Sequence, residues 1–61
     1  MNTDLNALCR ELIAELRRQV KFLKDEAKAS RQTGHHEASE MYLCQADALR
    51  VAAAQAERKL P

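Results

Sequence analysis

The sequence has few of the residues that punctuate loops or build sheets. Its 61 residues include one glycine, one proline, no tryptophan and two aromatic side chains, Phe22 and Tyr42. The scarcity of β-branched residues and of turn residues excludes a strand-rich fold. A chain of this length forms one small domain at most, which excludes a large pocket.

Long hydrophobic runs and a strong net charge are also missing. No apolar run exceeds four residues, so we expect no membrane-spanning helix. We also expect no secretory signal, because the first residues lack a continuous apolar segment. Cys9 and Cys44 are then expected to be reduced thiols of a cytoplasmic protein. The formal net charge of +1 gives no global reason to expect a nucleic-acid or lipid partner.

Helical periodicity dominates what remains, with alanine and leucine supplying most of the apolar residues. Apolar side chains recur at spacings of three and four, which predicts a helix over about residues 4–31. Thr3 is the expected N-cap, with Asp4 in the first turn. Cys9 is expected to be a small core residue. The predicted apolar face contains Leu5, Leu8, Cys9, Leu12, Leu16, Val20, Leu23 and Ala27, with Ile13 at its edge.

A second helical pattern follows a short break. Gly34 has free access to positive φ, and it predicts either the end of the first helix or a tight connection over about residues 32–35. The second helix is expected over about residues 36–59. Its apolar face is wide and contains Ala38, Met41, Tyr42, Gln45, Ala48, Leu49, Ala52, Ala53, Ala56 and Leu60. The predicted fold is an all-α antiparallel two-helix hairpin that forms a single domain over residues 1–61.

A single hairpin is expected to need a partner, because one seam buries only part of each apolar face. We predict that two hairpins form a dimeric four-helix bundle, most simply a C2 homodimer; completion by another protein is the alternative. The length and architecture resemble the small plasmid RNA-regulating hairpins that dimerise into four-helix bundles, a resemblance of fold without a shared motif. The predicted oligomer interface contains Leu12, Leu16, Leu23, Met41, Leu49 and Ala52.

The cations of the first helix gather on one side. They lie within about 80° of one another, beside the apolar face. Such a stripe can follow a phosphate backbone or an acidic protein groove, or it can be a solvated flank paired with carboxylates of a neighbouring helix. No aromatic residue interleaves with it, so single-strand stacking is poorly supported. The stripe consists of Arg10, Arg17, Lys21, Lys24, Lys28 and Arg31.

Two large apolar residues lie outside the predicted apolar faces. Phe22 falls among polar residues of the first helix, and Leu43 is similarly displaced on the second. Both either mark a docking surface for a partner or seal an interface within the oligomer.

No set of side chains predicts catalysis or a cofactor. Two helices offer neither a cleft nor an oxyanion site, so we expect no enzymatic activity. His35, His36 and Cys44 lack the spacing typical of a zinc site, and we predict no metal; a site shared across a dimer is the alternative.

The expected function is a non-enzymatic protein–protein interaction module, a small regulator, adaptor or inhibitor that docks on a protein partner. The alternative is a nucleic-acid-binding regulator that uses the cationic stripe. The predicted partner-binding residues are Phe22, Leu43, Arg17, Lys21, Lys24 and Lys28.

Overall fold

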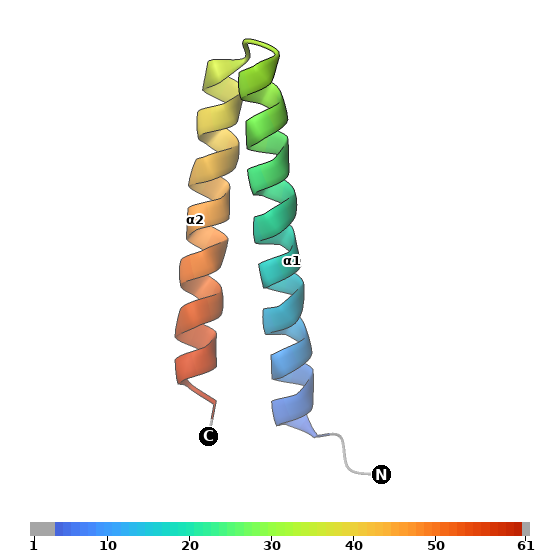
Figure 1. Cartoon of the computed structure of the whole chain (residues 1–61). Coiled ribbons are helices and arrows are strands. Elements are labelled where there is room, and N and C mark those ends of the chain that lie inside the picture. Colours follow the sequence, from blue (N-terminus) through green and yellow to red (C-terminus); the bar gives the residue numbers. More distant parts are fainter. Residues whose placement is uncertain (1–3, 61) are drawn as a thin grey trace.

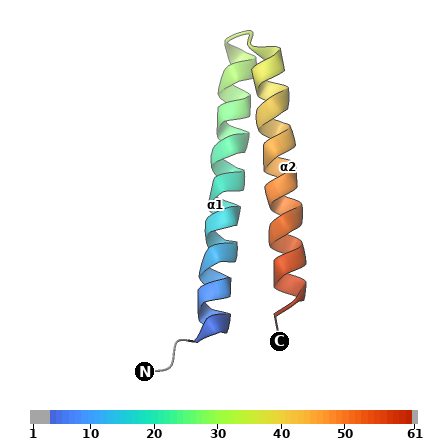
Figure 2. The ribbon, with the colours of Figure 1, turned by 180° about the vertical axis from the view of Figure 1, so that it is seen from behind.

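The computed structural model, which describes residues 4–60, contains two long antiparallel helices (Figure 1). Helix α1 spans Leu5–Gln32 and helix α2 spans His36–Arg58. The helices lie side by side, and the first turn of α1 and the last turn of α2 lie at the end of the hairpin opposite the connecting loop (Figure 2). The prediction of an all-α hairpin is confirmed, and the observed helix bounds lie within one residue of the predicted ones.

Asp4 caps the N-terminus of α1. Its carboxylate accepts hydrogen bonds from the backbone N–H groups of Asn6 and Ala7, at 3.0 and 3.3 Å. These groups have no partner within the helix, so an acceptor at this position stabilises the first turn. The prediction that Asp4 lies in the first turn is therefore wrong by one position, and Thr3 lies outside the described residues.

The loop reverses the chain in a Schellman motif centred on Gly34. The N–H of His35 donates to the carbonyl of Ser30 at 2.8 Å, and the N–H of Gly34 donates to the carbonyl of Arg31 at 3.1 Å. This pattern requires a left-handed residue just after the helix, and Gly34 supplies it with φ of 83°. The Thr33 hydroxyl lies 3.2 Å from the Ala29 carbonyl. The connection is therefore fixed by backbone bonds.

The helices meet along a seam whose residues repeat every seven positions, with spacings of alternately three and four, as in an antiparallel coiled coil. The most buried of them are Ile13, Ala27, Ser39, Ala46 and Ala53. All seam residues are buried or half-buried: Ile13, Leu16, Val20, Leu23, Ala27 and Ser30 on α1, Ser39, Tyr42, Ala46, Leu49, Ala53 and Ala56 on α2, and Leu60 just after α2.

Small residues bring the two backbones close together. Ser39, Ala46 and Ala53 follow one another at seven-residue intervals on α2, so one of the two seam positions of this helix carries only small side chains. The Ser39 hydroxyl donates to the backbone carbonyl of Ala27 on α1 at 2.8 Å, within the buried seam. A serine side chain can reach the backbone of a neighbouring helix only where the two helices approach closely. The hydrogen bond also satisfies the one buried polar side chain among the described residues.

The seam differs from the predicted apolar faces at both helices. Ile13, expected at an edge, is buried, whereas Leu12, expected within the face, is exposed. On α2 the predicted face omits Ser39 and Ala46, both of which are buried, and includes Met41, which is exposed. The seam of each helix is thus rotated away from the centre of its predicted apolar face.

Helix α1 extends beyond the end of α2. It has 28 residues and α2 has 23, and both abut the same loop. At about 1.5 Å per residue, the difference leaves roughly the first 7 Å of α1 with no helix opposite it. Cys9 lies near this overhang and is exposed, so the prediction that it is a core residue is wrong.

Candidate interaction surfaces

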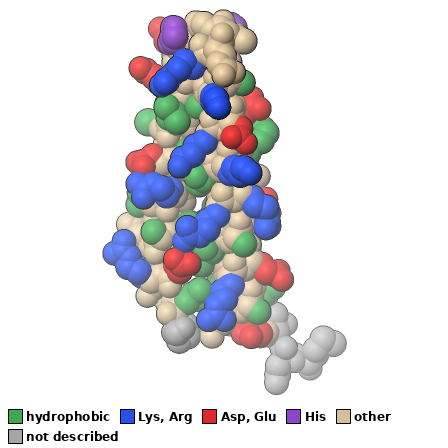
Figure 3. Space-filling view, viewed as in Figure 1, with side chains coloured by type: hydrophobic (Ala, Val, Ile, Leu, Met, Phe, Trp, Pro, Cys, Tyr) green, Lys and Arg blue, Asp and Glu red, His purple; other side chains and the backbone are tan. Residues whose placement is uncertain are grey.

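One side of the hairpin is cationic. We count the seven-residue repeat from Ile13, Val20 and Ala27 on α1 and from Ser39, Ala46 and Ala53 on α2. The fifth position on α1 is then basic in every repeat, as Arg10, Arg17, Lys24 and Arg31. Lys and Arg side chains extend along the whole length of this side (Figure 3). We call this surface the cationic face; it consists of Arg10, Arg17, Lys21, Lys24, Lys28 and Arg31 on α1 and Leu43 and Arg50 on α2.

The cationic face spans the groove between the helices. Arg17 on α1 forms an ion pair of 2.9 Å with Glu57 on α2, and both side chains are at least half exposed. Arg50 pairs with Asp47 of its own helix. Exposed pairs of this kind contribute at most about 1 kcal/mol, so a partner can replace them. The other cations of the face form no ion pair with a residue that the structure describes.

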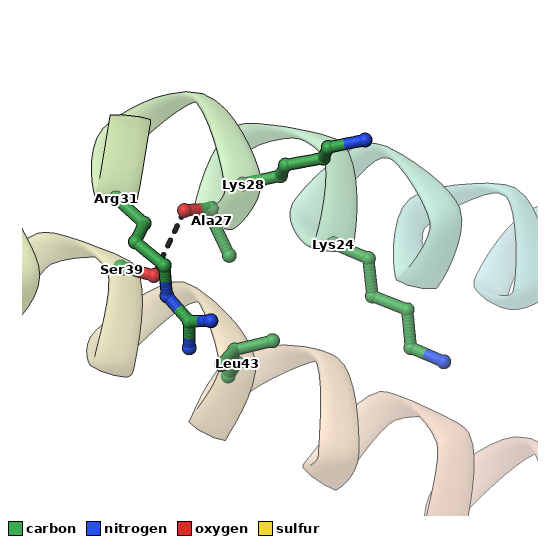
Figure 4. A pocket seen from close by; sticks show the side chains of 6 residues that line it. All are labelled: Lys24, Ala27, Lys28, Arg31, Ser39 and Leu43. Carbon is green, nitrogen blue, oxygen red and sulfur yellow. Dashed lines mark hydrogen bonds between the residues drawn. The ribbon is translucent and has the colours of Figure 1, made fainter. Parts of the chain in front are cut away.

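A hollow of about 160 Å³ opens on the cationic face near the loop. Its floor contains the Ser39–Ala27 hydrogen bond, and Leu43 forms its wall on α2 (Figure 4). Lys24 and Arg31 flank the hollow from α1, and Arg31 extends across toward Ser39 and Leu43 (Figure 4). The hollow therefore combines an apolar wall with cationic rims.

A second hollow, of about 280 Å³, lies in the same groove toward the chain ends. Arg10, Ile13 and Arg17 line it from α1. Glu57 lines it from α2, and Leu60 lines it just after the end of that helix. Ile13 and Ala27, one at each hollow, are two repeats apart, which corresponds to about 21 Å along the helix. The groove thus offers two recesses spaced four helical turns apart.

The opposite side of the hairpin carries large exposed apolar residues. Leu5 and Leu12 are 71% and 65% exposed, and Met41 and Phe22 are 64% and 56% exposed. These residues occupy the third and seventh positions of the repeat, across the seam from the cationic residues. We call this surface the apolar flank; it consists of Leu5, Leu8, Leu12 and Phe22 on α1 and Met41, Ala48 and Ala52 on α2, all exposed.

The structure separates the two apolar residues that the sequence singled out together. Leu43 lines the hollow of the cationic face. Phe22 lies two positions before Lys24, and therefore about 160° from it around α1. The predicted partner-binding cations Arg17, Lys21, Lys24 and Lys28 share a side with Leu43, whereas Phe22 belongs to the apolar flank.

The predicted oligomer interface also divides into two groups. Leu16, Leu23 and Leu49 are half-buried in the seam of the hairpin itself. Leu12, Met41 and Ala52 are exposed on the apolar flank. The helical spacing of apolar residues in the sequence therefore placed two groups in one predicted interface: residues that pack within the hairpin and residues that stay exposed.

Glu15 is a carboxylate within the apolar flank, at the same position of the repeat as Leu8 and Phe22. It accepts hydrogen bonds from Arg18 at 3.0 Å and from Gln19 at 3.4 Å, within α1. The hydrogen bond from Arg18 lowers the pKa of Glu15 below its usual value. The carboxylate therefore stays ionised and paired with a cation of its own helix, so it adds little net charge to the flank.

The histidines of the loop serve local structure. His35 Nδ1 lies 2.9 Å from the Thr33 hydroxyl, and His36 begins α2. Cys44 and Cys9 are both free and exposed. Over residues 4–60, no three side chains of His, Cys, Asp or Glu lie close enough together to hold a metal ion. Metal binding by His35, His36 and Cys44 across a dimer stays an untested alternative.

Neither helix, within the part of the chain that the structure describes, is long and apolar enough to cross a membrane.

Comparison of the chain with models of known protein families, with curated proteins and with solved structures finds no match. The functional argument therefore rests on the two surfaces of the hairpin.

Proposed function

We propose that this hairpin is a non-enzymatic protein-binding module, a small regulator or adaptor that docks on an acidic surface of a partner protein. The observation that carries the proposal is the gathering of cations on one side of the seam, around hollows with apolar walls. Charge complementarity speeds association and selects the partner, while a buried apolar contact supplies much of the affinity.

The hollow near the loop is the proposed centre of this contact. Leu43 offers an apolar wall within reach of Lys24 and Arg31, so an apolar side chain flanked by carboxylates fits it. An acidic amphipathic helix placed along the groove presents such residues at three- and four-residue spacings. We propose that the module acts as a homodimeric four-helix bundle in the cytoplasm, where its exposed cysteines stay reduced.

Nucleic acid is the second candidate partner, because six cations along one straight helix can follow a phosphate backbone. The apolar wall that Leu43 gives the hollow near the loop favours a protein instead, because phosphates do not use an apolar contact.

Charge reversal tests the proposal with a matched control. The variant Lys24→Glu reverses a cation of the cationic face, and Arg58→Glu changes the net charge equally at an exposed position of the last turn of α2, outside that face. The tagged proteins are used to capture partners from the native host, with mass spectrometry as the readout. We expect an acidic protein that is captured by the wild type and by Arg58→Glu and is lost with Lys24→Glu.

Two results contradict the proposal. Equal capture of the partner by both variants would show that the cationic face does not bind it. Binding of the wild type to a 20-base-pair duplex of DNA or RNA in a gel shift, with a steep loss of affinity as salt rises, favours the nucleic-acid alternative.

A further inference from the structure

The apolar flank leaves more large apolar side chains exposed than the seam buries completely. The buried apolar residues among those described are one isoleucine and three alanines, Ile13, Ala27, Ala46 and Ala53. Single exposed apolar residues are ordinary on protein surfaces, but a run along one side of both helices marks an interaction site.

The surface area of the chain indicates how much a partner must cover. The whole chain, termini included, exposes 5011 Å². A compact monomer of its mass of 6.9 kDa exposes only about 4,000 Å². The difference, on the order of 1,000 Å², is similar to the roughly 800 Å² that each partner buries in a standard interface. One further interface of ordinary size would therefore bring this chain to the surface area of a compact protein.

Charge decides which side of the hairpin can face a second copy. In a C2 dimer the same patch of each chain meets itself, so like charges within the patch oppose one another across the axis. On the cationic face, the row of Lys and Arg residues of α1 would oppose the same row of the other copy, and the acidic residues of that face, Asp47 and Glu57, are already paired with Arg50 and Arg17. The apolar flank carries none of the Lys or Arg residues of α1. Its carboxylates on α1 are Glu15, which is paired with Arg18, and Glu26.

We propose that the apolar flank is the interface of a C2 homodimer, in which Leu5, Leu8, Leu12, Phe22 and Met41 are buried against a second copy of this chain. Ala48 and Ala52 on the same flank let the α2 helices approach closely. This inference rests on the homodimer of the proposed function and names the face that forms it. In the resulting four-helix bundle both cationic faces point outward, so one dimer offers two identical docking surfaces.

The test compares two substitutions that lie two positions apart on α2. Met41→Lys places a charge on the apolar flank, and Leu43→Lys places the same charge on the cationic face; both residues are exposed in the hairpin. The molar mass is measured by light scattering after size-exclusion chromatography at micromolar concentration. We expect twice the chain mass of 6.9 kDa for the wild type and for Leu43→Lys, and the chain mass alone for Met41→Lys.

Phe22→Lys is a second variant, on α1, for which we also expect the monomer mass. Helix content by circular dichroism separates dissociation from unfolding. The wild-type mass should also persist at 0.5 M salt, because an apolar interface is not screened by ions. A monomeric wild type, or a dimer that Leu43→Lys dissociates and Met41→Lys does not, overturns the inference.

Failure of this inference is distinguishable from failure of the proposed function. A monomer that still captures its partner through Lys24 contradicts the dimer alone. A dimer that captures nothing through this residue contradicts the docking proposal alone.

Discussion

The cationic face and the apolar flank are built by the same two helices, but on opposite sides of the seam. On α1, the positions that follow the seam residues are basic, as in Arg17 and Lys24, whereas those on the other side are apolar, as in Leu12 and Phe22. Neither side contributes much to closing the hairpin, because the seam lies between them. The difference shows how a chain with a small core can hold two surfaces of distinct chemistry in one rigid frame.

The comparison also shows why the two sides suit different partners. A surface with an excess of cations repels its own copy, but it can bind a surface of opposite sign. A mainly apolar surface can pair with itself under C2 symmetry. The hairpin therefore separates self-association from partner binding by the chemistry of its two sides, and substitutions should affect the two separately.

The largest expected effect is a loss of stability of the whole hairpin, which carries both surfaces. Ile13→Ala removes the largest buried side chain of the seam, and we expect a loss of about 2–4 kcal/mol in the free energy of unfolding. Urea denaturation at one fixed protein concentration measures it, since a dimer's stability depends on concentration. Val51→Ala, on an exposed residue outside the seam, is the control and should change stability by less than about 1 kcal/mol. Similar losses of unfolding free energy for the two variants would contradict the burial of Ile13 in the seam.

A smaller loss of stability is expected on substitution in the loop, which fixes how α1 and α2 align along the seam. Gly34 has φ of 83°, and an added Cβ would meet no atom within 4 Å. The penalty for Gly34→Ala is therefore conformational, about 1–2 kcal/mol. Gly34→Asn should lose less, because asparagine tolerates this conformation better. Thermal unfolding of both variants measures the difference, and equal stability of Gly34→Ala and wild type would disprove the role of the turn.

Loss of the N-cap should affect the apolar flank alone. Asp4→Ala removes the acceptor for the N–H groups of Asn6 and Ala7, which we expect to lower the stability of the first turn by about 1 kcal/mol. Leu5 and Leu8 belong to this turn, so dimerisation should weaken while docking at the cationic face is unchanged. Faster amide hydrogen exchange at Asn6 and Ala7 reports the fraying, and Asp4→Asn, which keeps an acceptor, should not show it.

The smallest effect is expected on the cationic face. Arg17 and Glu57 are exposed, so a double-mutant cycle of Arg17→Ala and Glu57→Ala should give a coupling energy below about 1 kcal/mol. The coupling should fall further at high salt, because ions screen exposed charges. A coupling of several kcal/mol would mean that this pair holds the helices together and is not free to face a partner.

Local sequence signals predicted the hairpin well. The positive φ of Gly34 and the two long helices follow from features within a few residues, namely the only glycine and the three- and four-residue spacing of apolar side chains. These preferences act without knowledge of the packing partner. The cationic side of α1 was also visible in the spacing alone.

The seam was harder to predict because an undistorted helix and a coiled coil have different periods. Leu12 and Ser30 are 18 residues apart, which is five full turns at 3.6 residues per turn, so a helical wheel superimposes them. The observed seam repeats every seven residues and drifts by about 20° per repeat relative to that wheel. Ser30 is therefore half-buried in the seam, and Leu12 is exposed.

The residue types of the remaining seam positions gave no sign that these positions are buried. Ser39 is polar, and nothing in its neighbourhood on the chain shows that a carbonyl of α1 lies within reach of its hydroxyl. Ala46 is one of many alanines in α2, so its burial has no distinctive sequence signal. The separation of Phe22 from Leu43 likewise follows from the antiparallel packing, which joins positions far apart in the chain.

The sparse seam has a consequence for how this protein can diversify. Because few residues hold the helices together, most positions of the chain are open to substitution at little thermodynamic penalty. Descendants of such a hairpin can exchange one binding specificity for another while keeping their fold, and protein engineers can regraft either surface in the same way.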